Sequence, residues 1–460
     1  MAGWNFRVAN PFRRRPAKRA KTPPPADLGA VVRPLTRVMG SAVDKPRVPG
    51  FQATASDQPS SRSGNRFVAM HSKLRNAFTP SQPVADRRMF AGRDDILSAI
   101  IHSIEDQRLH IVIYGERGIG KTSLLHMLAQ AAADARYIVI YTSCGANSSF
   151  DDAMRTAATD IPVLFHSGFA PTDRQAEKGD TLADLLPEGP VSPRRFADLC
   201  AKLTGTRVLI ILDEFDRCES SAFRRDVAEL TKHLSDRRGR VQLVLAGVAA
   251  DLTQLIAHIP PIRRNRFAQR VPKMSDDEVL KIIANGEREV GFSFEPAATE
   301  LVVAVSRGSP YLANLLCHHA AHDALSADRP TVTASDIVNA VDRTSVEFEG
   351  RIGRSVQKRV QRLIEQDHAE DLAAAARASM TMDGAFSLVD LQEINQIDSA
   401  TATRTVKLLL SDGLLVPAND EEERERFEFC EEGLPMYLWI SAAQRNLQAK
   451  RNTKATAAAN

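Results

Sequence analysis

The chain has 460 residues, 43% hydrophobic and 25% charged, which allows about two to four folded domains and excludes a fibrous or wholly disordered protein. No apolar run approaches the roughly 18 residues of a membrane span, so we expect no transmembrane segment. A reducing, cytoplasmic location is favoured by five scattered cysteines with no disulfide or metal-ligand spacing: Cys144, Cys200, Cys218, Cys317 and Cys430.

The net charge of +3 is unevenly distributed, because residues 1–40 hold nine basic side chains and one acid, Asp27. Residues 1–65 are rich in Pro, Arg, Ser and Ala without hydrophobic periodicity, which predicts a disordered basic tail. The aromatic residues Trp4, Phe6 and Phe12 lie among its arginines, a mixture that suits nucleic acid or an anionic membrane surface. A solvated tail without a specific partner and a transit peptide are the alternatives.

The folded part begins with two predicted helices, over residues 66–77 and over the stretch after Gly92 up to residue 105. A strand pattern follows at 111–114 and a helix pattern at 123–133. The turn between them matches G-x-x-x-x-G-K-[ST], the loop whose backbone N–H groups surround phosphate. We predict that ATP binds here, to Gly115, Glu116, Arg117, Gly118, Ile119, Gly120, Lys121, Thr122 and Ser123.

The chemistry of this loop gives two of its side chains specific roles. Lys121 would reach the β- and γ-phosphates, and the Thr122 hydroxyl would bind Mg²⁺. The helix after the loop adds free amides and the positive end of its dipole.

A second nucleotide signature follows two buried-strand patterns, at residues 137–141 and 209–212. The latter strand runs into Asp213 and Glu214, at the carboxyl end where open α/β sheets bind ligands. Asp213 would hold Mg²⁺, and Glu214 would polarise the attacking water. A simple helix cap is the alternative interpretation of this acid pair. A helix at 220–234 and a strand at 242–248 complete the pattern of a parallel α/β core.

A Phe-x-Gly-Arg-Asp element, Phe90 to Asp94, precedes the phosphate loop. This element resembles the one at the entry to AAA+ ATPases of the origin-recognition and STAND type. Together with the loop and the acid pair, the resemblance covers roughly residues 85–440. In those families the element packs near the adenine. The resemblance implies a P-loop core over 66–272, a helical lid with its linking helix over 273–366, and a winged helix-turn-helix over 367–442. We expect residues 443–460 to form a flexible tail.

Two positions depart from the pattern of the AAA+ relatives. The strand that usually ends in a polar γ-phosphate sensor ends here in Ala246, Gly247 and Val248. The lid motif Gly-x-Pro-Arg reads Gly308-Ser309-Pro310-Tyr311, which is closer to STAND-type switch ATPases. We therefore expect slow turnover.

An arginine-rich segment follows, at residues 260–271. In the resembled families an arginine in this region reaches the γ-phosphate of a neighbouring subunit, which favours Arg264 or Arg266 as a catalytic residue in a homo-oligomer. A solvated basic turn is the alternative.

The C-terminal pattern is three helices, at 372–380, 387–397 and 399–411, followed by two strands. In a DNA-binding winged helix the third helix would enter the major groove with Thr401, Thr403, Arg404 and Lys407. The turn between the strands, residues 420–425, carries five acids and one arginine and would repel phosphates. A winged helix that binds protein is therefore the rival interpretation.

These patterns predict an ATP- and Mg²⁺-dependent switch ATPase that is slow and associated with DNA, in replication, transposition or defence. The alternative is a STAND-like signalling ATPase whose winged helix and tail bind protein or membrane.

Overall fold

The computed structural model describes residues 66–80, 82–237, 239–249, 266–382, 384–418 and 425–459. The predicted basic tail at 1–65, Arg264, and residues 420–424 of the acidic turn lie outside these ranges.

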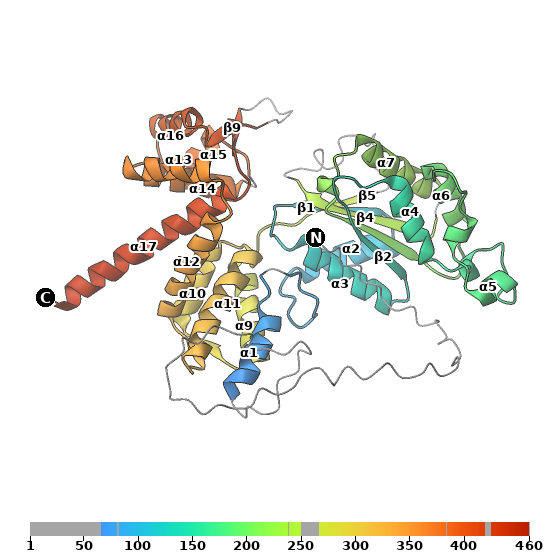
Figure 1. Ribbon diagram of the computed structural model, residues 1–460, viewed down its shortest axis with the longest axis horizontal. Helices are drawn as coiled ribbons and strands as arrows, with labels where there is room; N and C mark the ends of the chain where they lie inside the picture. Colours follow the sequence, from blue (N-terminus) through green and yellow to red (C-terminus); the bar gives the residue numbers. More distant parts are fainter. Residues whose placement is uncertain are drawn as a thin grey trace, which may run out of the picture. The chain divides into compact units, whose positions relative to one another are not determined.

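The core is a five-stranded sheet with the order β2-β3-β4-β1-β5, in which every neighbouring pair is parallel (Figure 1). This confirms the predicted parallel α/β core. The strands are β1 (His110–Gly115), β2 (Ile138–Ser143), β3 (Val208–Asp213), β4 (Val241–Val248) and β5 (Arg266–Arg270). The edge strand β5 lies in the arginine-rich segment at residues 260–271, where the sequence patterns predict no strand. An edge strand needs backbone pairing on one side only, so this short and mainly polar sequence suffices there.

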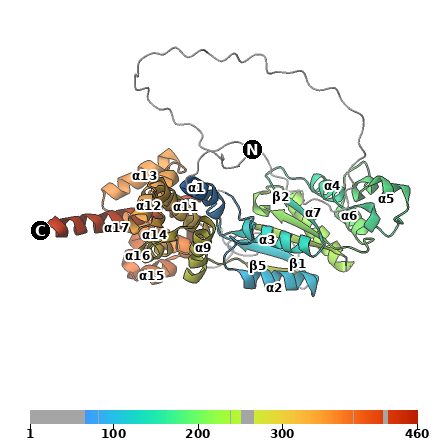
Figure 2. The ribbon, with the colours of Figure 1, turned by 90° about the horizontal axis from the view of Figure 1, so that it is seen from below.

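Helices cover both faces of this sheet, as its mainly apolar and buried central strands require (Figure 2). In β3, Leu209 and Ile211 pack with α2 (Asp94–Glu105) and α3 (Lys121–Asp134). The alternate residues Ile210 and Leu212 pack on the other face, with α4 (Phe150–Thr159), α6 (Pro193–Cys200) and α7 (Ser221–Asp236). The short helix α5 (Arg174–Lys178) lies between α4 and α6 in sequence.

A second hydrophobic core unites the lid helices α9 (Asp276–Val290), α10 (Pro296–Ser306), α11 (Pro310–Ser326) and α12 (Ala334–Glu349). The N-terminal helix α1 (Arg66–Ala77) packs into this core, although we expected it to belong with the ATPase core. The contact is tight: a Cβ on Gly286 of α9 would lie 2.1 Å from the Phe78 ring.

The C-terminal unit contains α13 (Arg354–Glu365), α14 (Ala369–Thr381), α15 (Leu388–Asn395) and α16 (Ser399–Ser411). A small antiparallel sheet of order β8-β10-β9 lies beside them, formed by Phe386–Ser387, Arg426–Phe429 and Leu415–Pro417. The predicted third helix, 399–411, is confirmed as α16.

The last element differs from the expected flexible tail, because α17 (Leu434–Ala459) continues the chain as one helix. Gln444 and Gln448 of α17 both donate hydrogen bonds to Asp342 of α12. Leu447 packs against the lid core, so tertiary contacts support a segment whose composition is polar and basic. Among the described residues, no helix combines the length and the hydropathy that a membrane crossing requires.

Candidate nucleotide site

The predicted phosphate loop lies between β1 and α3, where the chain turns on glycines. Gly118 and Gly120 have φ values of 73° and 94°, in the left-handed region that a glycine adopts without steric cost. A Cβ on Gly115 would lie 2.7 Å from the Val271 carbonyl oxygen, so this position also needs glycine. Ile119 is buried in the core and anchors the loop. The loop therefore has the backbone that a phosphate cradle requires.

Other loop side chains hold neighbouring segments. The Glu116 carboxylate forms an ion pair with Lys273, with Oε1 and Nζ 3.1 Å apart. The Ser123 hydroxyl accepts a hydrogen bond from the amide of Val84, in the connector before α2. Arg117 pairs with Glu432, at the turn into α17, with 2.6 Å between Nη1 and Oε2. These three predicted ligands could contribute backbone groups to a nucleotide, while their side chains already bind protein.

The Lys121 ammonium bends back over the loop. Its Nζ donates hydrogen bonds to the carbonyl oxygens of Gly115 and Glu116, at 2.8 and 2.7 Å, and the residue is only 8% exposed. Burial lowers the pKa of Lys121 to about 8, against a partial opposing effect of Asp216 and Asp213. A buried cation of this kind gains from a nearby polyanion, so its chemistry fits phosphate.

This pKa predicts proton uptake on nucleotide binding. Bound phosphates favour the charged amine and raise its pKa, so affinity for ADP should fall as the pH rises above about 8. At pH 8, about half of the free sites lack the proton, so binding should take up roughly 0.5 proton. Calorimetry in buffers of different ionisation enthalpy measures this uptake. The matched control is Lys121→Arg, whose guanidinium stays charged and should remove the uptake; an unchanged uptake in that variant would contradict the assignment.

The acidic end of β3 lies next to the loop, because β3 and β1 both flank β4. Thr122 Oγ1 donates to Asp213 Oδ2 at 2.9 Å, although the two residues are 91 positions apart in sequence. Asp213 is 4% exposed, and its other oxygen accepts from the backbone amide of Glu214 at 2.8 Å. A hydroxyl and a carboxylate are the hard oxygen donors that Mg²⁺ prefers, so these residues fit the ion.

Within the described part of the chain, no group of three or more His, Cys, Asp or Glu side chains is arranged to hold a metal ion. Mg²⁺ in nucleotide-binding enzymes is usually held by one or two protein oxygens together with substrate phosphates.

Glu214 follows Asp213 in a left-handed conformation, with φ of 54°. Its Oε2 accepts a hydrogen bond from Ser143 Oγ at 2.9 Å, and its Oε1 lies 3.3 Å from Arg217 Nη2. Strained backbone at such a position is typical of functional residues. The side chain is 38% exposed, so the carboxylate can meet water while two neighbours hold it.

Sequence reasoning missed the residues of β2 that face these acids. Tyr141 Oη donates to Asp213 Oδ2 at 2.7 Å, and Ser143 holds Glu214. Burial, followed by the charge of Asp213, raises the pKa of Tyr141 well above its ordinary value. The two residues are two apart on one strand, so they share a face, and their polar groups in an apolar strand were the available signal.

The two positions that depart from AAA+ relatives also lie around the site. At the tip of β4, the amide of Val248 donates to Asp216 Oδ1 at 2.8 Å, and the tip carries no polar side chain. On the lid side, the Cβ of Tyr311 lies 3.4 Å from the position that a Cβ on Gly118 would take. The Tyr311 hydroxyl accepts a hydrogen bond from Arg351 Nη1 at 2.7 Å, so the lid already occupies it.

Arg93 from the Phe-x-Gly-Arg-Asp element is 5% exposed and crosses to the lid connector, where Nη2 donates to the carbonyl of Pro272 at 2.7 Å. Its backbone amide donates to Glu278 Oε1 at 3.0 Å. Burial lowers the pKa of Arg93 to about 10. Its Nε and Nη1 are buried without a hydrogen-bond partner among the described residues, so they are donors that a ligand could satisfy.

Arg266, one of the two arginines predicted to act on a neighbouring subunit, starts β5 opposite His110. It lies at the amino ends of the strands, whereas the phosphate loop leaves the carboxyl end of β1. The structure therefore does not bring Arg266 to the loop of its own chain.

In this sheet a glycine loop follows β1, and the acidic end of β3 lies beside it across one intervening strand. This arrangement defines the class of P-loop nucleoside triphosphatases. The family model described as Novel STAND NTPase 1, nSTAND1, matches residues 77–433. The chain belongs to this family, which agrees with the resemblance seen in the sequence.

Comparison with solved structures finds several similar folds. A Walker-type ATPase of Pyrococcus abyssi is 14% identical, with a TM-score of 0.47, over 79% of this chain and 99% of that one. The RuvB Holliday junction branch migration motor of Thermotoga maritima is 16% identical, with a TM-score of 0.42, over 75% and 95%. Cdc6p of Pyrobaculum aerophilum is 13% identical, with a TM-score of 0.43, over 81% and 98%. No curated protein matches the chain.

Proposed function

We propose that this chain is an ATP- and Mg²⁺-dependent switch that hydrolyses ATP slowly and associates with DNA. One observation supports the nucleotide part most directly: Thr122 of the phosphate loop and Asp213 of β3 meet at 2.9 Å. Convergence of these two oxygens beside a glycine cradle is what a nucleotide with its divalent cation needs.

In this proposal, the backbone of the loop and Lys121 bind the phosphates, while Thr122 and Asp213 hold the cation. Bound Mg²⁺ would neutralise charge on the phosphate oxygens. Glu214 would orient the attacking water by accepting a hydrogen bond from it, and would take its proton as the water oxygen bonds to the γ-phosphorus and ADP leaves. Ser143 orients the Glu214 carboxylate. Arg93, whose Nε and Nη1 lack hydrogen-bond partners among the described residues, would face the adenine of the nucleotide.

Slow turnover is expected because two polar groups that would contact the γ-phosphate in related ATPases are missing or already bonded here. The β4 tip offers Val248 where relatives offer a polar side chain, and the hydroxyl of Tyr311 is bound by Arg351. Each missing donor removes stabilisation of the charge that develops in the transition state, and such stabilisation is often the main source of an enzyme's rate acceleration. An arginine from a neighbouring copy, at 264 or 266, stays a prediction that requires assembly.

The switch rests on contacts that join the loop to the rest of the chain. Pro310 lies 3.7 Å from the position of a Cβ on Gly120, and Arg117 pairs with Glu432. Both members of that ion pair are more than half exposed, so it contributes little to stability and can exchange. A bound γ-phosphate would change these contacts and thereby shift the balance between two arrangements of the lid.

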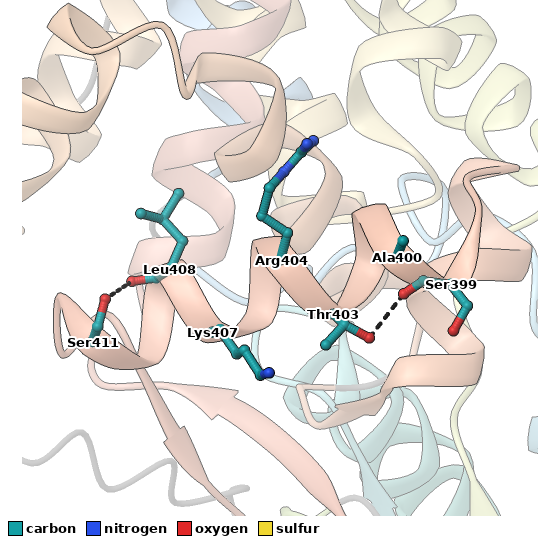
Figure 3. A pocket seen from close by; sticks show the side chains of 7 residues that line it. All are labelled: Ser399, Ala400, Thr403, Arg404, Lys407, Leu408 and Ser411. Carbon is teal, nitrogen blue, oxygen red and sulfur yellow. Dashed lines mark hydrogen bonds between the residues drawn. The ribbon is translucent and has the colours of Figure 1, made fainter.

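The DNA part rests on α16, which we assign as the recognition helix of a winged helix. Its outer face is an open surface (Figure 3), formed by Ser399, Ala400, Thr403, Arg404, Lys407, Leu408 and Ser411. Arg404 and Lys407 are exposed there and extend away from the helix (Figure 3). Two cations that share a helix face with the small polar side chains of Ser399, Thr403 and Ser411 suit phosphates and base edges.

Replacing both Arg404 and Lys407 by alanine should weaken duplex DNA binding and reduce the slope of log K against log salt by about two. Fluorescence anisotropy of labelled duplex across a salt series measures this slope. The matched control removes two exposed cations from α9, Lys281 and Arg288, and should leave the slope unchanged. Absence of any shift by the full-length protein at low salt would contradict a DNA partner, whereas affinity lost only on deletion of residues 1–65 would assign it to the tail.

A second candidate is a signalling ATPase whose winged helix and basic tail bind protein or membrane. The acidic turn at 420–425 favours it, since five acids in six residues repel phosphate. The DNA-binding measurement separates the two functions.

A further inference from the structure

The Asp213 carboxylate is held by a phenol from the neighbouring strand. Tyr141 Oη donates at 2.7 Å to Oδ2, the same oxygen that accepts the Thr122 hydroxyl at 2.9 Å. In the sheet register Tyr141 lies opposite Ile211, two residues before Asp213. Side chains two residues apart share a face of a strand, so Tyr141 is placed to reach Asp213 by the sheet itself.

The Tyr141 ring is fixed from a second direction. The imidazole of His126, on α3, meets it edge to face with ring centroids 5.3 Å apart. The same helix begins with Lys121 and Thr122. Tyr141 therefore connects the helix that carries one oxygen donor to the strand that carries the other, and its phenol has little freedom to turn away.

We propose that Tyr141 is a positioning residue for the divalent cation: its hydroxyl fixes the orientation in which Asp213 shares the cation with Thr122. This inference rests on the proposed nucleotide function. Without the phenol, Thr122 is the one side-chain donor that Oδ2 keeps among the described residues. Hydrogen bonds to metal-ligating carboxylates set ligand orientation, and their loss typically costs about 10–100-fold in metal affinity.

Replacing Tyr141 by phenylalanine separates a structural role from a positioning role. The variant keeps the ring that packs against His126 and loses only the hydroxyl that bonds Asp213. Tyr141→Phe should therefore fold normally. With the protein loaded with ADP, we expect the dissociation constant for Mn²⁺, measured from the free-ion EPR signal, to rise by about 10-fold or more. ADP affinity in EDTA should stay within about twofold, since the phenol does not belong to the phosphate loop.

Turnover gives a second measurement. In Tyr141→Phe the Mg²⁺ concentration for half-maximal ATPase activity should rise by a similar factor, while the rate at saturating Mg²⁺ stays near that of the wild type. A purely structural defect would lower the rate at every Mg²⁺ concentration.

Tyr137→Phe is the matched control. It removes a hydroxyl just before the same strand, where Tyr137 Oη accepts from Arg207 Nη1 at 2.9 Å. Its Mn²⁺ affinity should equal that of the wild type. If the wild type binds Mn²⁺ with ADP and Tyr141→Phe binds it equally well, the positioning role is overturned while the nucleotide function stands. If the wild type binds neither ADP nor Mn²⁺ with ADP, the proposed function itself fails.

Discussion

Replacing Lys121 by alanine should remove measurable ATP binding. The Lys121 ammonium is buried over the phosphate loop, where hydrogen bonds to two loop carbonyls hold it, and bound phosphates would replace those carbonyls as its partners. Hydrogen bonds to charged groups contribute about 1.5–3 kcal/mol each, and Lys121 would serve two phosphates. The loss corresponds to an increase in the dissociation constant of roughly 100-fold or more. Calorimetric titration of ATP with Mg²⁺ measures it.

The matched control for this variant is Lys281→Ala, which removes an exposed lysine from α9 and should bind ATP like the wild type. Thermal melts of both proteins establish that each is folded. A Lys121→Ala protein that is folded and binds ATP with unchanged affinity would contradict the assignment of the phosphate loop.

Replacing Glu214 by glutamine should preserve ATP binding and hold the protein in its ATP state. The amide keeps the size of the carboxylate and can still accept a hydrogen bond from Ser143, but it cannot accept a proton from water. Loss of a general base typically lowers the rate by about 10²–10⁴-fold, an effect of about 3–5 kcal/mol on the barrier. Single-turnover hydrolysis measures the rate, and the nucleotide recovered from the purified protein shows whether ATP stays bound.

Glu219→Gln is the control for that variant, since Glu219 is an exposed acid five residues further along the same loop. It should hydrolyse ATP at the wild-type rate. Normal hydrolysis by Glu214→Gln would place the base elsewhere in the site.

The core of this site could be predicted because its chemistry is local in sequence. The residue order around Gly120 and Lys121 requires a strand, a tight turn and a helix, and the apolar run before Asp213 requires a buried strand. Pairing of the two segments then followed from the rule that ligands bind at the carboxyl ends of parallel strands.

The contacts between strands could not be predicted from the same patterns. Which residue of β2 faces Asp213 depends on sheet order and register, and a shift by one residue would turn Tyr141 to the other face. The same limit applies to β5, which among the described strands pairs with β1 alone, more than 150 positions earlier in sequence.

Composition also misled where tertiary contacts decide the structure. Residues 443–459 are polar and basic, which is typical of a free tail, yet α17 bonds to Asp342 and packs Leu447 on the lid. Helix α1 follows the predicted bounds, but its apolar face serves the lid core. Amphipathic periodicity predicts that a face is buried without identifying its partner.

The most direct test of the central claim is the affinity of the full-length protein for ATP and ADP, titrated with Mg²⁺ and again with EDTA. If Thr122 and Asp213 hold a cation beside the phosphate loop, binding should be clearly tighter with Mg²⁺, and the difference should disappear in Asp213→Asn. Absence of magnesium-dependent affinity for either nucleotide in the folded wild type would contradict the account.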